Sequence, residues 1–145
     1  FRGVFLHAKI RHELDGELLI LPSDFRQYLS RSIKQFTSKG GRNINRSIKN
    51  RAFREEFMVF SGRRTILKSI LSDYMMRSIM EYIDREDKYI YISFRKSDIY
   101  LAVTEQKDLL EPFLFQSNVS FDLIREFFED IHMLLEIVED LDSMH

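Results

Sequence analysis

An α+β domain built on one mainly antiparallel sheet is the fold class that the sequence predicts, from three observations. Residues 88–104 alternate apolar and polar side chains in two runs joined by a polar turn, a pattern typical of a β-hairpin. Residues 120–141 carry apolar side chains at steps of three and four, which is typical of a long C-terminal helix. Other strand-like and helix-like runs are interspersed between the chain ends, so we expect about five strands packed with three or four helices. A length of 145 residues fits one domain, 1–145.

The first two strands are predicted at residues 1–10, which alternate, and at residues 17–21, a short apolar run. Residues 14–16 between them (Leu-Asp-Gly) are typical of a turn, and we therefore interpret the two runs as a hairpin. Pro22 ends the second strand, because proline cannot donate a ladder hydrogen bond. A third strand is predicted at residues 56–60 (EFMVF).

Two helices are predicted ahead of the hairpin at 88–104. The first follows a capping residue at Ser23 or Asp24, and its apolar positions are Phe25, Tyr28, Leu29, Ile33 and Phe36. The second has helical spacing over residues 64–84. Ser72, followed by an aspartate, could divide this second segment by capping a new helix.

The chain is expected to end on a single long helix. Residues 109–115, which contain Pro112, form an extended passage before it, and Ser120 is its predicted cap. The apolar stripe comprises Phe121, Ile124, Phe127, Phe128, Ile131, Leu134, Leu135, Val138 and Leu141. We expect this helix to pack on the strands of the hairpin.

The hairpin presents one aliphatic face and one tyrosine face, because successive side chains of a strand point to opposite sides. The aliphatic face carries Ile90, Ile92, Phe94, Ile99, Leu101 and Val103, and the tyrosine face includes Tyr89, Tyr91 and Tyr100. We expect the long helices to cover the aliphatic face. The tyrosine face is either half-solvated or covered by the helix that begins near Phe25, in preference to a surface from a partner.

The composition indicates a soluble globular domain and excludes cysteine chemistry. Apolar residues make up 44% and charged residues 31% of the chain, and cysteine is absent, which removes disulfides, thiolate metal sites and cysteine nucleophiles. No window approaches the roughly 20 apolar residues that span a bilayer. Because the chain starts at Phe1, we expect it to be excised from a longer protein.

The net charge of −1 hides a strong segregation of charge along the chain. Residues 24–68 contain 12 basic and 3 acidic side chains, a local charge of +9. Residues 73–145 contain 7 basic and 17 acidic side chains, a local charge of −10. Such asymmetry indicates either an anionic partner for the middle of the chain or internal pairing of the two parts.

Residues 39–54 (the basic segment) are the strongest candidate binding region. We expect a mobile basic loop or a weak helix, whose cations contact an anionic surface: Lys39, Arg42, Arg46, Lys49, Arg51 and Arg54. A solvated loop, or one paired with the acidic helices, is the alternative. Nucleic acid is the less favoured partner, because Phe53 is the only aromatic residue available for stacking on bases.

No motif fixes a catalytic or metal site. His7 and His12, with Glu13 and Asp15, have none of the spacings that place paired metal ligands on one side of a helix. Carboxylates of the last helix lie at surface-compatible positions. We therefore predict no catalytic residue, metal or cofactor, and keep an enzyme with an unrecognised site as an alternative to a binding domain.

The order of several weak motifs resembles the bacterial domain of unknown function 3137 family over nearly the whole chain. The motifs are an aromatic-glycine-aromatic opening, a strand that ends in leucine-proline, a phenylalanine-rich strand, a helix start with a capping hydroxyl, and an apolar-glutamate-proline passage. In this sequence they are Phe1, Gly3 and Phe5; Leu21 and Pro22; residues 53–60; Ser72; and residues 109–115. Asp73 stands where the family usually has proline, and Leu110 where it has an aromatic residue.

The resemblance implies a bacterial protein, commonly with two membrane-spanning helices ahead of this domain, and it implies no known activity or catalytic residue. On this basis we expect a non-enzymatic domain of a membrane-anchored protein. We expect it in the cytoplasm at the bacterial inner membrane, where it binds a protein partner or the anionic membrane surface.

Overall fold

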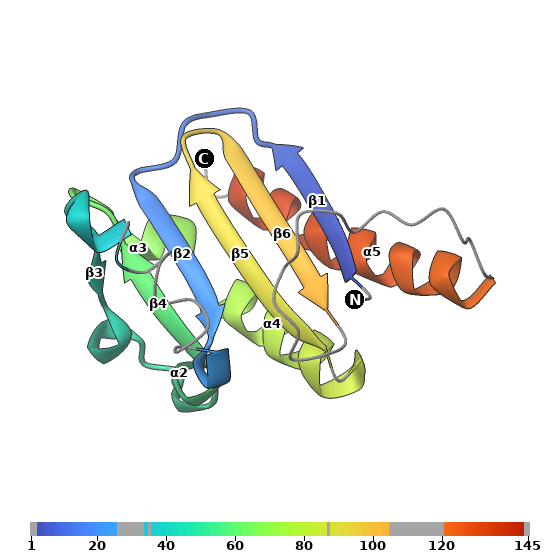
Figure 1. Cartoon of the computed structure of the whole chain (residues 1–145). Coiled ribbons are helices and arrows are strands. Elements are labelled where there is room, and N and C mark those ends of the chain that lie inside the picture. The colour runs from blue at the N-terminus through green and yellow to red at the C-terminus, as the bar shows by residue number, and fades with distance from the viewer. Residues whose placement is uncertain (1–2, 26–33, 35, 87, 105–120, 144–145) are drawn as a thin grey trace.

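The computed structural model describes residues 3–25, 34, 36–86, 88–104 and 121–143, and confirms an α+β fold on one antiparallel sheet (Figure 1). The sheet has six strands in the order β1-β6-β5-β2-β4-β3, and every pair is antiparallel. The strands are β1 (Gly3–Lys9), β2 (Glu17–Pro22), β3 (Arg42–Asn43), β4 (Phe57–Ser61), β5 (Tyr89–Arg95) and β6 (Asp98–Thr104). The five longer strands match the five predicted ones.

The longer helices lie together on one face of the sheet, behind it in Figure 1. The α-helices are α2 (Arg51–Glu56), α3 (Leu67–Ile70), α4 (Asp73–Glu86) and α5 (Phe121–Ser143), with two 3-10 turns, η1 (Ser23–Phe25) and η2 (Asn45–Ser47). Within these described elements, no helix is long and apolar enough to cross a membrane.

The predicted hairpin of the first two strands is wrong. β1 pairs with β6, and β2 pairs with β5 and β4, so the β5–β6 hairpin lies between the two strands that we expected to pair. The connection from β1 to β2 crosses the turn of that hairpin, where the N–H groups of Ile10 and Leu14 donate to the carbonyls of Ser97 and Lys96 at 2.9 and 2.8 Å. These bonds satisfy two buried backbone donors of the connection between β1 and β2.

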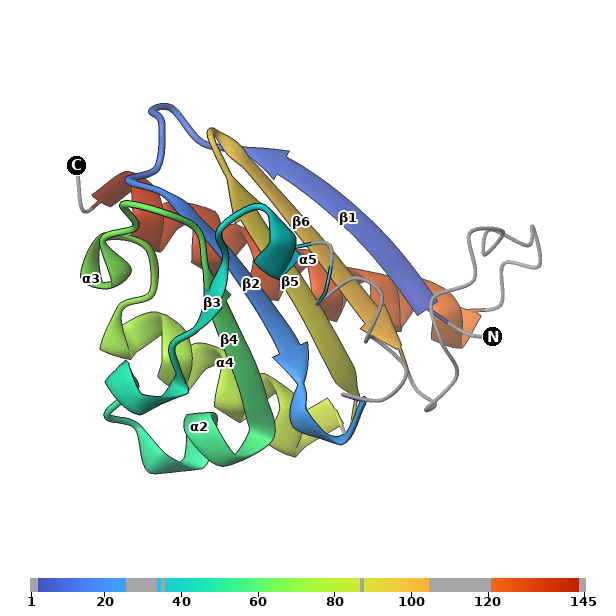
Figure 2. The same ribbon diagram turned by 60° about the vertical axis from the view of Figure 1, so that its left-hand side comes forward.

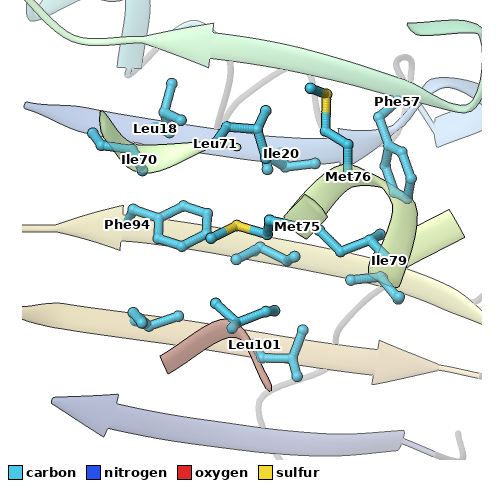
Figure 3. Close-up of a cluster of buried hydrophobic side chains, with 14 of the residues drawn as sticks. Leu18, Ile20, Phe57, Ile70, Leu71, Met75, Met76, Ile79, Phe94 and Leu101 are labelled. Carbon is cyan, nitrogen blue, oxygen red and sulfur yellow. The ribbon is translucent and has the colours of Figure 1, made fainter. Parts of the chain in front are cut away.

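The main core lies between the aliphatic face of the sheet and the helices. Figure 3 shows Met75, Met76 and Ile79 of α4 pointing toward the strands. The strand side chains in contact with them include Leu18, Ile20, Phe57, Phe94 and Leu101, all buried. This confirms that the long helices cover the aliphatic face of the β5–β6 hairpin.

The division of the helical segment at Ser72 is also confirmed. α3 ends at Ile70 and α4 begins at Asp73. Ser72 Oγ accepts a hydrogen bond from the Met75 N–H at 3.0 Å, which is the bond of an N-cap residue.

A smaller cluster covers part of the tyrosine face. Tyr91 is buried there, beside Phe36, which packs edge-on against Phe60 with ring centroids 6.5 Å apart. Tyr100 is only half-buried and Phe5 is exposed, so the face toward β1 is open among the described residues. The expected helix near Phe25 falls largely on residues 26–33, which lie outside the described part of the chain.

Over its described side chains, the last helix buries a different face from the one that its sequence predicts. Met133, Leu134, Ile137 and Leu141 are buried, whereas Leu135, which we expected to be buried, is 52% exposed. Met133, which is outside the predicted stripe, is buried on the other side of Leu134, so the buried face is turned away from Leu135. Side chains of successive residues project about 100° apart around a helix. Phe128, Ile131, the cap at Ser120 and the passage at 109–115 lie outside the residues whose side chains the structure describes.

Candidate anion-binding surface

The basic segment, predicted as a loop or a weak helix, consists of short regular elements. It contains β3 at the sheet edge, the turn η2 and the start of α2. Asn50 caps α2, because its Oδ1 accepts a hydrogen bond from the Phe53 N–H at 3.1 Å. The expected mobility of the segment stays a prediction.

Two apolar side chains and one amide attach the basic segment to the sheet. Ile48 and Phe53 are buried in the main core, where Phe53 lies 4.7 Å from the ring of Phe57. Asn45 makes hydrogen bonds at both ends of its amide, accepting from the Val59 N–H at 2.7 Å and donating to the Phe57 carbonyl at 2.9 Å. This attachment was not predicted, because the segment has few apolar residues.

The six predicted cations all remain exposed on this attached backbone. Arg51 pairs with Glu55 at 2.9 Å, and Arg54 donates to the Ile48 carbonyl at 3.3 Å. Within the described part of the chain, the other four have no ion pair or side-chain hydrogen bond. These four free cations are Lys39, Arg42, Arg46 and Lys49.

The basic segment contains the strand at one edge of the sheet, and the acidic C-terminal helix packs on the strand at the other edge and on α4. β3 forms one edge and β1 the other, and α5 packs on β1 and α4 (Figure 1). Among described residues, no ion pair joins the segment to α5. The carboxylates at the end of α5 are used locally, since Asp140 accepts from Ser72 and Asp142 lies near Arg11. Among the described residues, the basic segment and α5 therefore do not neutralise each other by direct ion pairs.

Other cations that sequence reasoning missed lie at two cavities. One, of about 340 Å³, has Lys39 together with Arg63 and Lys96, and also the carboxylates of Glu13 and Glu17. A second, also about 340 Å³, has Lys49 on one side and Lys68 on the other. Only tertiary packing brings these cations together, so no spacing in the sequence could have revealed them.

Each described histidine lies beside one carboxylate. His7 Nε2 is 2.7 Å from Asp98 Oδ1, and its ring stacks on Tyr100 at a centroid distance of 4.6 Å. The hydrogen bond with His7 holds the pKa of Asp98 below its ordinary value, and the charge of Lys9 acts in the same direction. His132 is 3.0 Å from Glu136 along its own helix.

His12 Nδ1 lies 3.8 Å from Asp142 Oδ1. Glu13 and Asp15, which the sequence placed near His12, are not part of this pair. Among the described residues, no three His, Asp or Glu side chains gather as a metal site. Elsewhere, burial raises the pKa of the Tyr91 phenol, against the effect of its hydrogen bond with Thr104. The His7 pair joins β1 to β6, and the His12 pair joins the β1–β2 connection to the end of α5. Among the described residues, none of the three histidine pairs includes a residue of the basic segment.

One comparison with known proteins gives a match. A family model described as a protein of unknown function, DUF3137, matches residues 1–143. No curated protein and no solved structure matches the chain.

Proposed function

The chain belongs to the DUF3137 family, and from that premise we propose that it is a non-enzymatic domain that binds an anionic membrane surface through the basic segment. The proposed setting is a bacterial protein anchored in the inner membrane, with this domain in the cytoplasm. The surface is then the leaflet to which the anchor holds the domain. A protein partner with an acidic face is the second candidate, because the same cations would serve it.

The position of the free cations carries this proposal. Arg42 and Arg46 are exposed at or beside the β3 edge, whereas α5 packs on β1, the strand at the other edge, and on α4. A domain with this layout has a strong electrical asymmetry across its sheet, which orients it near a charged surface. The basic edge would face the anionic lipid, and α5 would face away from it.

The expected affinity is low and suits a tethered domain. A basic side chain near an anionic leaflet contributes about 1 kcal/mol, so the four free cations contribute about 4 kcal/mol, roughly a thousandfold in binding constant. An anchor in the same chain would raise the effective concentration of lipid at the domain, and weak intrinsic binding would then be sufficient.

Vesicle binding of the Arg42→Gln/Arg46→Gln variant tests the proposal. We expect the wild-type chain to bind vesicles made of equal parts phosphatidylglycerol and phosphatidylcholine, and to ignore phosphatidylcholine alone. The variant should bind about 30-fold more weakly, from two losses of about 1 kcal/mol. Binding should fade as salt shortens the screening length from about 10 Å at 0.1 M to about 3 Å at 1 M.

A matched variant, Lys9→Gln/Arg95→Gln, removes the same net charge outside the basic segment and should retain binding. If both variants lost vesicle binding equally, net charge rather than the basic segment would explain the binding, and the proposal would be contradicted. The same proteins are then tested against single- and double-stranded DNA. Salt-sensitive binding to DNA without binding to vesicles would replace the membrane by nucleic acid as the partner.

A further inference from the structure

A groove of about 340 Å³ lies between η2, α3 and the start of α4, and it joins the basic segment to the helices. Figure 2 shows α3 on the same side of the molecule as the turn between β3 and α2. Lys49, from the basic segment, lines the groove together with Lys68, which is the second residue of α3. Both lysines are exposed, and neither has an ion pair among the described residues.

Apolar side chains make up much of the remaining lining of the groove. Ile48, Leu71 and Met76 are buried side chains of the main core that also line the groove, and Leu67 is half-buried beside them. A cationic rim over an apolar wall is complementary to a molecule whose charged group is joined to a hydrocarbon part. Just before Leu67, Ile66 is 57% exposed, which places a large aliphatic side chain in solvent next to the groove.

The polar groups of the groove leave a net positive charge. Asp73 is the only acid in its lining, against two lysines. The Ser72 hydroxyl is already engaged, because it donates to Asp140 Oδ2 at 2.6 Å and accepts from the Met75 N–H. Lys49 and Lys68 are therefore the cations of the described lining that are available to an anion.

We propose that this groove holds the headgroup phosphate of an anionic phospholipid between Lys49 and Lys68, with the glycerol and the first acyl methylenes on the apolar wall. The inference deepens the proposed function, on which it rests, by naming the lipid group that the domain recognises. A free phosphate would leave the apolar wall unused. A nucleic acid strand would find no aromatic side chain in the lining on which to stack.

The test is an amide NMR titration of the whole chain with two soluble probes, dihexanoyl phosphatidylglycerol below its micelle concentration and glycerol phosphate. We expect the lipid to shift the amides of residues 47–49 and 66–73, and glycerol phosphate to do so at much higher concentration only. Lys68→Gln should weaken lipid binding about fivefold, the equivalent of about 1 kcal/mol. Lys49→Gln should act similarly, and Lys9→Gln, at the far edge of the sheet, should have no effect.

Several outcomes would contradict the proposal that the groove binds a phospholipid headgroup. They are no shifts at these amides, equal affinity for glycerol phosphate and the lipid, or equal loss in Lys68→Gln and Lys9→Gln. The Arg42→Gln/Arg46→Gln variant separates this inference from the broader proposal, since it leaves both lysines in place. If that variant loses vesicle binding but the lipid shifts no amides in the wild type, membrane binding through the basic segment is supported and lipid binding in the groove is contradicted. If the shifts occur but that variant binds vesicles normally, lipid binding in the groove is supported and the role of Arg42 and Arg46 in membrane binding is contradicted.

Discussion

Ser72 and Asp140 join the start of α4 to the end of α5 through a hydrogen bond of 2.6 Å from the serine hydroxyl to Asp140 Oδ2. The same hydroxyl caps α4 by accepting from the Met75 N–H at 3.0 Å. One small side chain thus satisfies a helix end and orients a neighbouring helix, and 68 residues separate the two partners.

Ser72→Ala removes both hydrogen bonds at once. We expect it to lower the free energy of unfolding by about 1–2 kcal/mol, near the upper end for loss of an N-cap, because Asp140 also loses its donor. Urea unfolding gives the measurement. Ser143→Ala, which removes an exposed hydroxyl that donates to the Asp140 carbonyl, is the control and should change the midpoint little. Equal effects of the two variants would contradict the linking role of Ser72.

Leu134 and Leu135 provide a second pair of matched variants, since they are adjacent and chemically identical. Leu134 is 7% exposed and Leu135 52%. Leu134→Ala should lower the free energy of unfolding by about 2–5 kcal/mol, because it opens a cavity against the sheet, and Leu135→Ala by no more than about 0.5 kcal/mol. Thermal or urea unfolding of both variants would check the packing of α5. Equal costs would show that the helix is rotated from the position described.

The strands could be predicted from the sequence, but their order in the sheet could not. Alternation at residues 1–10 and a short apolar run at residues 17–21 correctly indicated two strands. Such a pattern carries no information on which strand lies alongside, and the short turn at residues 14–16 favoured a hairpin. The pairing of β5 with β6 could be predicted, because a short turn joins the two strands directly.

The candidate site was predictable in its charges and unpredictable in its shape. The six cations follow from the local excess of basic residues, whereas the sequence left open whether they pair with the acidic helices. Ile48 and Phe53 as anchors, and Lys68 as a neighbour of Lys49, depend on packing between segments far apart in the chain. Leu135 was misplaced because a broad apolar stripe does not show where the buried face ends.

Asn45 offers a test of how firmly the basic segment is held. Asn45→Ala leaves the Val59 N–H and the Phe57 carbonyl without their side-chain partner, which should lower the free energy of unfolding by about 1–3 kcal/mol. Trypsin should then cleave faster after Arg46, Lys49 and Arg51, because local opening of the segment becomes easier.

Asn43→Ala is the control for this cleavage, since Asn43 only accepts from the exposed Asn45 N–H. In the wild-type chain, the mobility expected from the sequence would make residues 39–54 the first site of tryptic cleavage. A wild-type segment that resists trypsin, and becomes sensitive in Asn45→Ala, would show that the amide rather than the charge pattern decides its mobility.

Because His7 bonds to Asp98, we expect the free energy of unfolding at acidic pH to depend on this histidine. The folded-state pKa of Asp98 is lowered, chiefly by this hydrogen bond, so the carboxylate contributes stability above its unfolded-state pKa, about 3.9. That contribution is lost as pH falls from about 4 through the folded-state pKa. His7→Phe retains a ring beside Tyr100 but cannot donate, so it should raise the carboxyl titration midpoint of Asp98 toward its ordinary value, as followed by NMR. It should also weaken the pH dependence of stability below about pH 4.

His132→Phe, which removes the separate pair with Glu136, should leave the Asp98 midpoint unchanged. An Asp98 midpoint that is the same in the wild type and in His7→Phe would show that the imidazole does not hold this carboxylate in solution.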